Sequence, residues 1–300
     1  MFTKVKKLVN HYREGGVKQA ASVSLRYLRK QLKKIPFLGN YVKFTKRYGV
    51  RHGIVFASLR NLFWVLPSDE TGTNVFDREW DVLIVVDTCR PEWMEKVAVE
   101  YDMIDEVETI RSVGARTSEW TVRPFRKASS VDQPVVYIYG SKYGEFANEV
   151  ADIDSTFVKD EHYKYPPANK ITDEALEQIE SKPEDCRFVI HYAQPHFPVF
   201  RRNGSRTDIE VVNATTRGAK SAAVESGGDY QTVEDLFVSN LRYVMDEVSI
   251  LVNERNNSQV ALTADHGQYV GEYFFVGHPP GGRGETVRNV PWVQIDGKSR

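Results

Sequence analysis

Acidic and imidazole side chains follow three short apolar runs of this 300-residue sequence. They are Asp87 at the end of 81–87, His196 after 187–192, and Asp265 with His266 after 259–263. Such runs predict strands buried in a parallel sheet, whose carboxyl ends meet at one edge. Carboxylate oxygen with imidazole nitrogen suits zinc, manganese or iron, whereas an all-oxygen set suits magnesium or calcium. We therefore expect at least one divalent metal ion (Zn, Mn, Mg or Ca) at this edge.

Hydroxyl side chains precede a predicted helix in the segment 113–120 (VGARTSEW). A hydroxyl beside a divalent cation becomes a nucleophile, because the cation lowers its pKa and a helix N-terminus favours the oxyanion. Thr117 is the expected nucleophile, and Ser118 or Ser112 could take its place. Thr117 could also be a plain helix cap.

Other polar side chains lie close to these motifs in the sequence. Arg90, Arg116 and Ser118 could contact an anionic substrate, the arginines bidentately, but a solvated or structural arginine fits the sequence as well. His278 lies twelve residues after His266, between a glycine and a proline. His191 falls inside a predicted strand, where we expect a structural role.

Apolar runs and helical patterns alternate beyond residue 80. Strands are predicted at 81–87, 134–139, 187–192, 259–263 and 290–295, and helices at 91–101, 117–127, 141–150, 172–181 and 232–254. This alternation predicts a three-layer α/β/α sandwich with a mostly parallel, doubly wound sheet covered on both faces. The polar segment 201–230 is too long for an ordinary connection and predicts a functional lid or a disordered stretch.

The order of these motifs resembles the alkaline phosphatase superfamily, in particular its sulfatase-like and phosphoethanolamine-transferase-like branches. There, an apolar strand ends in a metal-binding Asp, and a nucleophile segment, Pro-His-x-Pro, Asp-His-Gly, Gly-Glu, Gly-His and Val-Pro follow in turn. The corresponding segments here are 85–92 (VVDTCRPE), 117–120 (TSEW), 195–198 (PHFP), 263–267 (TADHG), 271–272 (GE), 277–278 (GH) and 290–292 (VPW). The match spans residues 80–295.

The resemblance implies an alkaline phosphatase-like fold and a role for each motif. By that resemblance Asp87, Asp265 and His266 bind a metal, Thr117 attacks the ester, and His196 and His278 contact the anion or a second metal. The chain departs from the sulfatases in two places. Cys89 begins the formylglycine pattern Cys-x-Pro-x-Arg but lacks its Arg, so we expect a buried small residue there. Val86 stands where many sulfatases have a second Asp.

The composition excludes a disordered chain, a collagen-like repeat and a disulfide scaffold, because 41% of the residues are hydrophobic and only two are cysteines. The formal net charge of -1 conceals a strong asymmetry. Residues 1–60 contain 15 Lys or Arg and the single acid Glu14, whereas the remainder contains 25 basic and 40 acidic residues. We divide the chain into a basic helical region, 1–70, and a catalytic domain, 75–300.

The basic region predicts an anionic partner. Apolar residues at helical spacing in 2–13, with lysines on the other faces, and a second helical stretch at 22–34 favour a membrane surface. Nucleic acid is disfavoured, since no recognised reading motif accompanies the charge. A helical appendage with solvated basic residues is the alternative. No secretory signal or spanning helix is evident, so we expect a cytoplasmic protein that can bind a membrane peripherally.

These observations together predict a metal-dependent, sulfatase-like hydrolase of a sulfate or phosphate ester that acts through a covalent intermediate on Thr117. One alternative is a phosphoryl-group transferase with a glycan or lipid acceptor. Another is a non-catalytic, membrane-apposed protein that binds an anion.

Overall fold

The computed structural model describes residues 37–66, 69–213, 230–254, 258–272 and 276–295. Contacts divide the chain into two compact units, Met1–Val65 and Leu66–Arg300. The helices expected at 2–13 and 22–34 lie outside the described residues.

The described part of the first unit is a helical hairpin of α2 (Leu38–Tyr48) and α3 (Val50–Val65). The chain reverses at Gly49, whose φ of 77° is a conformation that glycine adopts readily. Gly53 allows the helices to approach closely, because a Cβ there would lie 2.3 Å from Thr45 Cα. The rings of Phe44 and Phe56 pack edge to face between the helices, 4.4 Å apart. Among the described residues, no helix is both long and apolar enough to cross a membrane.

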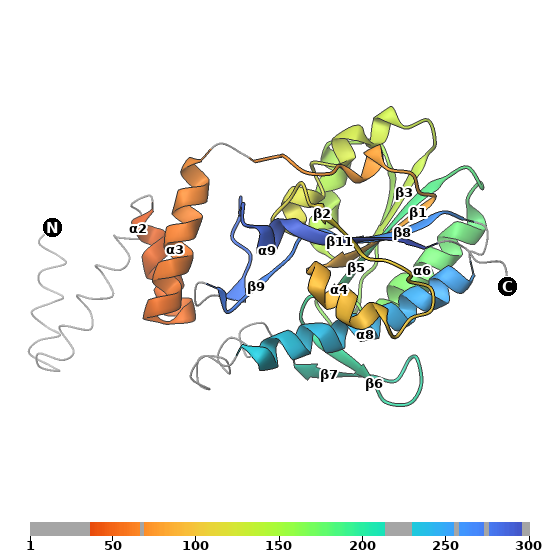
Figure 1. Cartoon of the computed structure of the whole chain (residues 1–300). Helices are drawn as coiled ribbons and strands as arrows, with labels where there is room; N and C mark the ends of the chain where they lie inside the picture. The colour runs from red at the N-terminus through yellow and green to blue at the C-terminus, as the bar shows by residue number, and fades with distance from the viewer. Residues whose placement is uncertain (1–36, 67–68, 214–229, 255–257, 273–275, 296–300) are drawn as a thin grey trace, which may run out of the picture. The chain divides into compact units, whose positions relative to one another are not determined.

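A seven-stranded sheet forms the centre of the second unit, in the order β2-β11-β8-β1-β5-β3-β4 (Figure 1). Its strands are β1 (Val82–Asp87), β2 (Glu108–Arg111), β3 (Val135–Tyr139), β4 (Asp154–Phe157), β5 (Arg187–Pro195), β8 (Val260–Ala264) and β11 (Asn289–Ile295). Strands β8, β1, β5, β3 and β4 run parallel, and β11 is antiparallel to both of its neighbours. All six residues of β1 are buried, as its continuous apolar run predicts.

Helices cover both faces of this sheet. On one face α4 (Pro91–Ala98), α6 (Ala168–Ser181) and α8 (Gln231–Asn253) lie together (Figure 1), with Trp93 of α4 stacked 5.0 Å from Phe237 of α8. The other face is covered by shorter helices, and Phe125 there packs 4.6 Å from Tyr137 of β3. These are α5 (Thr117–Trp120), η1 (Val75–Asp77) and η2 (Phe125–Ser130). The predicted α/β/α fold with a mostly parallel sheet is confirmed.

Several element boundaries differ from the sequence predictions. The helix expected at 117–127 ends at Trp120, and the chain continues through turns and Pro124 into the 3-10 helix η2. The segment expected as a helix at 141–150 is the 3-10 helix η3 (Lys142–Glu149).

Short elements complete the unit. Within the polar segment 201–230 the chain forms part of a hairpin of β6 (Val199–Arg202) and β7 (Ile209–Asn213). A second small ribbon pairs β9 (Tyr269–Val270) with β10 (Val276–Gly277), and α9 (Glu285–Arg288) precedes β11.

Candidate metal centre and nucleophile

The carboxyl ends of three adjacent strands bring the predicted ligands together. Asp87 is the last residue of β1, which pairs with β5 on one side and β8 on the other. Asp265 and His266 directly follow β8, and His196 directly follows β5. Because β1 lies between the other two strands, residues nearly 180 positions apart in sequence meet at one edge of the sheet.

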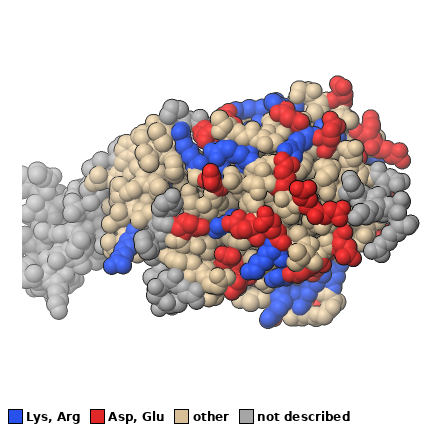
Figure 2. Space-filling view, in the orientation of Figure 1, with Lys and Arg blue, Asp and Glu red and all other residues tan. Residues whose placement is uncertain are grey.

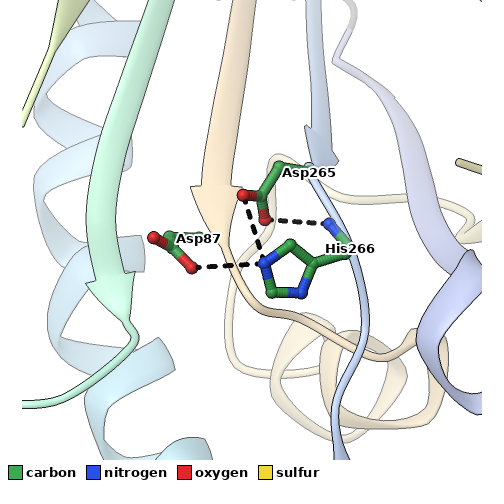
Figure 3. Close-up of side chains that lie close together, drawn as sticks. All are labelled: Asp87, Asp265 and His266. Atoms are coloured by element: carbon green, nitrogen blue, oxygen red, sulfur yellow. Dashed lines mark hydrogen bonds and ion pairs between the residues drawn. The ribbon is translucent and has the colours of Figure 1, made fainter. Parts of the chain in front are cut away.

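Asp87, Asp265 and His266 form a buried cluster at this edge (Figure 3). One ligand atom from each lies within 4.8 Å of the other two. His266 Nε2 lies 3.4 Å from Asp265 Oδ2 and 3.8 Å from Asp87 Oδ1. All three side chains point toward one another, from the ends of β1 and β8.

Backbone geometry after β1 fixes the two carboxylates. Thr88 has a φ of 73°, which is rare for a β-branched residue. Its N–H donates to Asp265 Oδ1 at 2.9 Å, and its hydroxyl donates to Asp87 Oδ1 at 2.7 Å. Cys89 N–H then donates to His266 O at 3.0 Å. The strained residue therefore links the two strand ends and leaves the other carboxylate oxygens for further contacts.

Burial controls the ionisation of the cluster. It raises the pKa of Asp87 to about 6, with the nearby charge of Asp265 adding to the effect, and raises the pKa of Asp265 to about 7. Burial also lowers the pKa of His266 and of His196 below the usual value, although Asp87 opposes the shift in both. The imidazoles are thus neutral at pH 7, the state in which they bind metals.

The donor set fits a divalent cation. Asp265 Oδ2 and His266 Nε2 are buried and have no hydrogen-bond partner, although buried polar atoms almost always have one. Among the described residues, no Lys or Arg forms an ion pair with Asp87 or Asp265. Two carboxylates and a neutral imidazole that share an uncompensated negative charge suit zinc, manganese or iron.

Thr117 lies beside this cluster. It is the first residue of α5 and is buried, and its hydroxyl donates to Asp87 Oδ2 at 3.4 Å. Arg116 occupies the cap position, so the Thr117 hydroxyl is not used as a helix cap. The alternative Ser112 is engaged elsewhere: its hydroxyl donates to Asp265 O at 2.5 Å and accepts from Gly114 N–H at 3.2 Å. Ser118 is partly buried in the same helix.

His196 lies at the same edge, in a loop that a buried asparagine fixes. His196 N–H donates to Asp87 O at 3.1 Å, and its Nδ1 lies 2.8 Å from Phe197 O. Asn240 of α8 donates its amide N–H groups to the carbonyls of Pro195, His196 and Pro198 at 3.0 to 3.2 Å. The sequence analysis did not identify Asn240. A signal was present, since helical spacing from Phe237 and Val244 puts this polar residue on the buried face of α8.

His278 comes to the cluster from the β9–β10 ribbon, and its ring lies 4.2 Å from that of His266. The loop after it is tied to α5 through Glu119, whose carboxylate accepts from Ala115 N–H at 3.0 Å and Gly281 N–H at 2.8 Å. This carboxylate thus connects the Thr117 helix with the His278 loop. Glu119 was not identified from the sequence.

The two predicted substrate-binding arginines have acidic partners within the chain. Arg90 binds Glu272 at 2.8 Å and also pairs with Glu92. Arg116 Nε lies 3.2 Å from Glu119, and the Arg116 side chain is 42% exposed. Cys89 is fully buried, and burial raises the pKa of its thiol well above the usual value. A thiol in this state is a poor nucleophile.

His191 of β5 is buried behind the cluster. Its Nδ1 lies 2.9 Å from the Tyr137 hydroxyl, and its Nε2 lies 3.8 Å from Asp265 Oδ2. Burial lowers the pKa of His191 to about 3, so the ring is neutral. The position of His191 inside a strand predicts a structural role, and the structure also puts the residue next to a predicted ligand.

No protein-family model matches the sequence, and the curated proteins contain no significant match. Among solved structures, the soluble domain of lipooligosaccharide phosphoethanolamine transferase A from Neisseria meningitidis is similar, with a TM-score of 0.51 and 15% identity over 71% of this chain and 75% of that one. The integral membrane form of that protein is similar with a TM-score of 0.55 and 14% identity over 93% of this chain. The chain spans 60% of the length of that protein. An alkaline phosphatase superfamily protein from Vibrio parahaemolyticus gives 0.43 and 10% over 84% of this chain and 71% of that one.

The central sheet and its helices therefore have the fold of the phosphoethanolamine transferases. The fold that the resemblance implied is therefore confirmed by the comparison with this transferase.

Proposed function

We propose that this chain is a metal-dependent enzyme that cleaves a phosphate ester through a covalent intermediate on Thr117. The observation that carries the proposal is the hydrogen bond between the Thr117 hydroxyl and Asp87, at the rim of a buried Asp-Asp-His cluster. A hydroxyl and a ligand set at this separation are the parts that covalent ester cleavage requires. The lipooligosaccharide phosphoethanolamine transferase of similar fold, known in a soluble and an integral membrane form, is compatible with this chemistry.

Each protein group has a defined part in the reaction. Asp87, Asp265 and His266 would hold the metal ion, which when bound lowers the pKa of a neighbouring hydroxyl and neutralises charge on the transferred group. Asp87 orients the Thr117 hydroxyl toward the substrate. The Thr117 hydroxyl gives up its proton to solvent as its oxygen attacks phosphorus, the bond to the leaving oxygen breaks, and that oxygen takes up a proton from solvent to leave as the alcohol. His196 and His278 stand at the same edge to contact the transferred group.

Water or an acceptor alcohol then attacks the phosphothreonine, and Thr117 leaves with a proton. Water gives a hydrolase, and an alcohol on a glycan or lipid gives a transferase. A phosphate ester is favoured over a sulfate ester because Cys89, the residue nearest to a formylglycine motif, is buried and protonated. The Pro-His-x-Pro run at 195–198 favours a sulfatase-like activity instead, so sulfate esters form the second arm of the test.

The test compares Thr117→Ala with Thr109→Ala, which makes the same change at an exposed position of β2. With an aryl phosphate and added Zn²⁺ or Mn²⁺, we expect Thr117→Ala to reduce kcat on the order of 10³-fold and Thr109→Ala to leave it unchanged. Mass spectrometry of the rapidly quenched native enzyme should show a phosphate on Thr117. Turnover by Thr117→Ala at the native rate would refute the proposal, and turnover of aryl sulfate alone would refute its phosphate specificity.

Metal binding has its own measurement. Zn²⁺ or Mn²⁺ should raise the Tm of the native protein and not that of Asp87→Asn, because the variant loses one charged ligand. Equal Tm shifts in the two proteins would show that Asp87 is not a metal ligand.

A further inference from the structure

Helix α3 is rich in apolar residues, interspersed with Arg51, Ser58 and Arg60, and only part of its surface is covered within the hairpin. Phe56 and Ala57 face α2 and are buried, and Gly53 makes the close approach to that helix. The apolar surface of a helix is stable when it meets an apolar environment. The hairpin supplies that environment on one side of α3.

Another side of α3 presents an exposed stripe of large apolar residues. Its members follow helical spacing and have exposed fractions of 69% for Val50, 45% for Ile54, 50% for Leu62 and 60% for Val65. In the described part of the second unit, large exposed apolar residues are scattered singly over separate elements, as at Val99 of the α4 C-terminus and Val212 of β7. The exposed Ser58 and Arg51 also lie on this side of α3. Four large exposed apolar residues on one side of a helix, with polar residues between them, mark an interaction site.

The charges around the stripe are all of one sign. Residues 37–65 contain five basic residues, Lys43, Lys46, Arg47, Arg51 and Arg60, and no Asp or Glu. Lys43, Lys46 and Arg51 are exposed. In the space-filling view, the hairpin surface is predominantly tan and lacks the red patches that cover the second unit (Figure 2).

We propose that the α2–α3 hairpin binds the surface of an anionic lipid bilayer, with the Val50–Val65 stripe inserted at the level of the headgroups. Helices that combine an apolar face with basic residues lie in this interfacial layer, where burial and attraction to anionic lipid both contribute. The proposal does not depend on the activity of the second unit.

Charge favours an anionic bilayer over the other partners that could cover the stripe. A second copy of the hairpin on the stripe would bring two basic surfaces together without one acidic side chain between them. Residues 1–36 contain ten Lys or Arg and the single acid Glu14, so packing them on the stripe has the same cost. An anionic bilayer supplies both the apolar layer and the opposite charge.

The test uses the full chain and vesicles of phosphatidylglycerol with phosphatidylcholine, compared with phosphatidylcholine alone. We expect binding to the anionic vesicles that weakens as NaCl rises from 0.1 to 0.5 M. The double substitution Ile54→Glu with Leu62→Glu should weaken it on the order of 10-fold or more. Val99→Glu, which places the same charge on an exposed valine of the second unit, should leave it unchanged.

A fluorescence measurement distinguishes insertion from adsorption through the basic residues alone. The native thiols, Cys89 and Cys186, are buried, so an environment-sensitive fluorophore should label an Ile54→Cys variant at position 54. Its emission should shift to shorter wavelength on anionic vesicles, whereas a label at Val99→Cys should not respond. The proposal is overturned if the double variant binds anionic vesicles with native affinity, or if the emission of the label at position 54 does not shift. It is also overturned if the native protein forms a dimer without vesicles and the double variant does not.

Discussion

Two groups of buried carboxylates in the second unit differ in how their charge is compensated. Glu247 of α8 is fully buried, and its carboxylate accepts from Arg202 of β6 and from Arg206 at 2.6 Å. Arg206 in turn binds Asp173 of α6 at 2.6 Å. This network fixes the β6–β7 hairpin to α6 and α8, and both oxygens of Glu247 have guanidinium partners.

Asp87 and Asp265 are equally buried but have no guanidinium or ammonium partner among the described residues. Their neighbours are neutral imidazoles and a hydroxyl, and burial raises the pKa of both carboxyls. A buried charge without a partner is costly, and a protein retains one where a ligand compensates it. The contrast indicates that Glu247 stabilises the fold and that the strand-end cluster is built for a cation.

The largest expected effect is on the free energy of unfolding, when a substitution disrupts the network around Glu247. Glu247→Gln removes the buried anion that Arg202 and Arg206 share, and removal of one partner of a buried pair costs about 3–5 kcal/mol. Urea denaturation should show this loss in the free energy of unfolding, while the Zn²⁺ affinity of the folded variant stays within about twofold of the native value. Loss of metal affinity in a folded Glu247→Gln protein would contradict the separation of the two groups.

A smaller effect on stability is expected at Asp265 in metal-free protein, where a substitution should stabilise the fold as pH rises. The folded-state pKa of about 7 exceeds the usual 3.8, so the folded state binds more protons than the unfolded state between these values. The stability that this group contributes therefore falls as pH rises from about 4 to 7. Asp265→Asn removes that dependence, and its stability relative to the native protein should increase by on the order of 2 kcal/mol between pH 5 and pH 8.

Thermal denaturation in the presence of a chelator, at several pH values, measures that change. Added Zn²⁺ at pH 8 should raise the Tm of the native protein and not that of Asp265→Asn, because only the native protein keeps its full set of ligands. A relative stability of Asp265→Asn that is the same at pH 5 and pH 8 would show that burial does not perturb this carboxyl.

The elements that position the ligands were predictable because each has a strong local signal. Six consecutive buried residues in β1 appear in the sequence as a continuous apolar run, and polar residues directly after it predict a strand end. The placement of Asp87, His196 and Asp265 at one edge of the sheet then followed from the rule that parallel strands present their carboxyl ends there. Their approach to within a few ångströms depends on the strand order, with β1 between β5 and β8, which local patterns do not contain.

The residues that support the ligands were harder to predict, because their contacts join distant segments. Glu119 contacts Gly281, 162 positions away, and Asn240 contacts His196, 44 positions away. The positive φ of Thr88 occurs together with its two hydrogen bonds to the carboxylates, one of which joins it to Asp265, 177 positions away. A periodicity shows that Asn240 is buried, but only the fold shows what it binds.

The smallest expected effect tests the connection that Glu119 makes. Glu119→Gln replaces one acceptor oxygen with an amide that cannot accept from a backbone N–H, so either Ala115 or Gly281 loses its partner. Because this shifts the His278 loop relative to Thr117, kcat on an aryl phosphate should fall about 3- to 10-fold while KM changes less than twofold. Glu108→Gln, which disrupts the exposed pair with Arg78, is the matched control and should leave kcat unchanged. An equal change in KM, or no change in kcat with a lowered Tm, would limit Glu119 to a structural role.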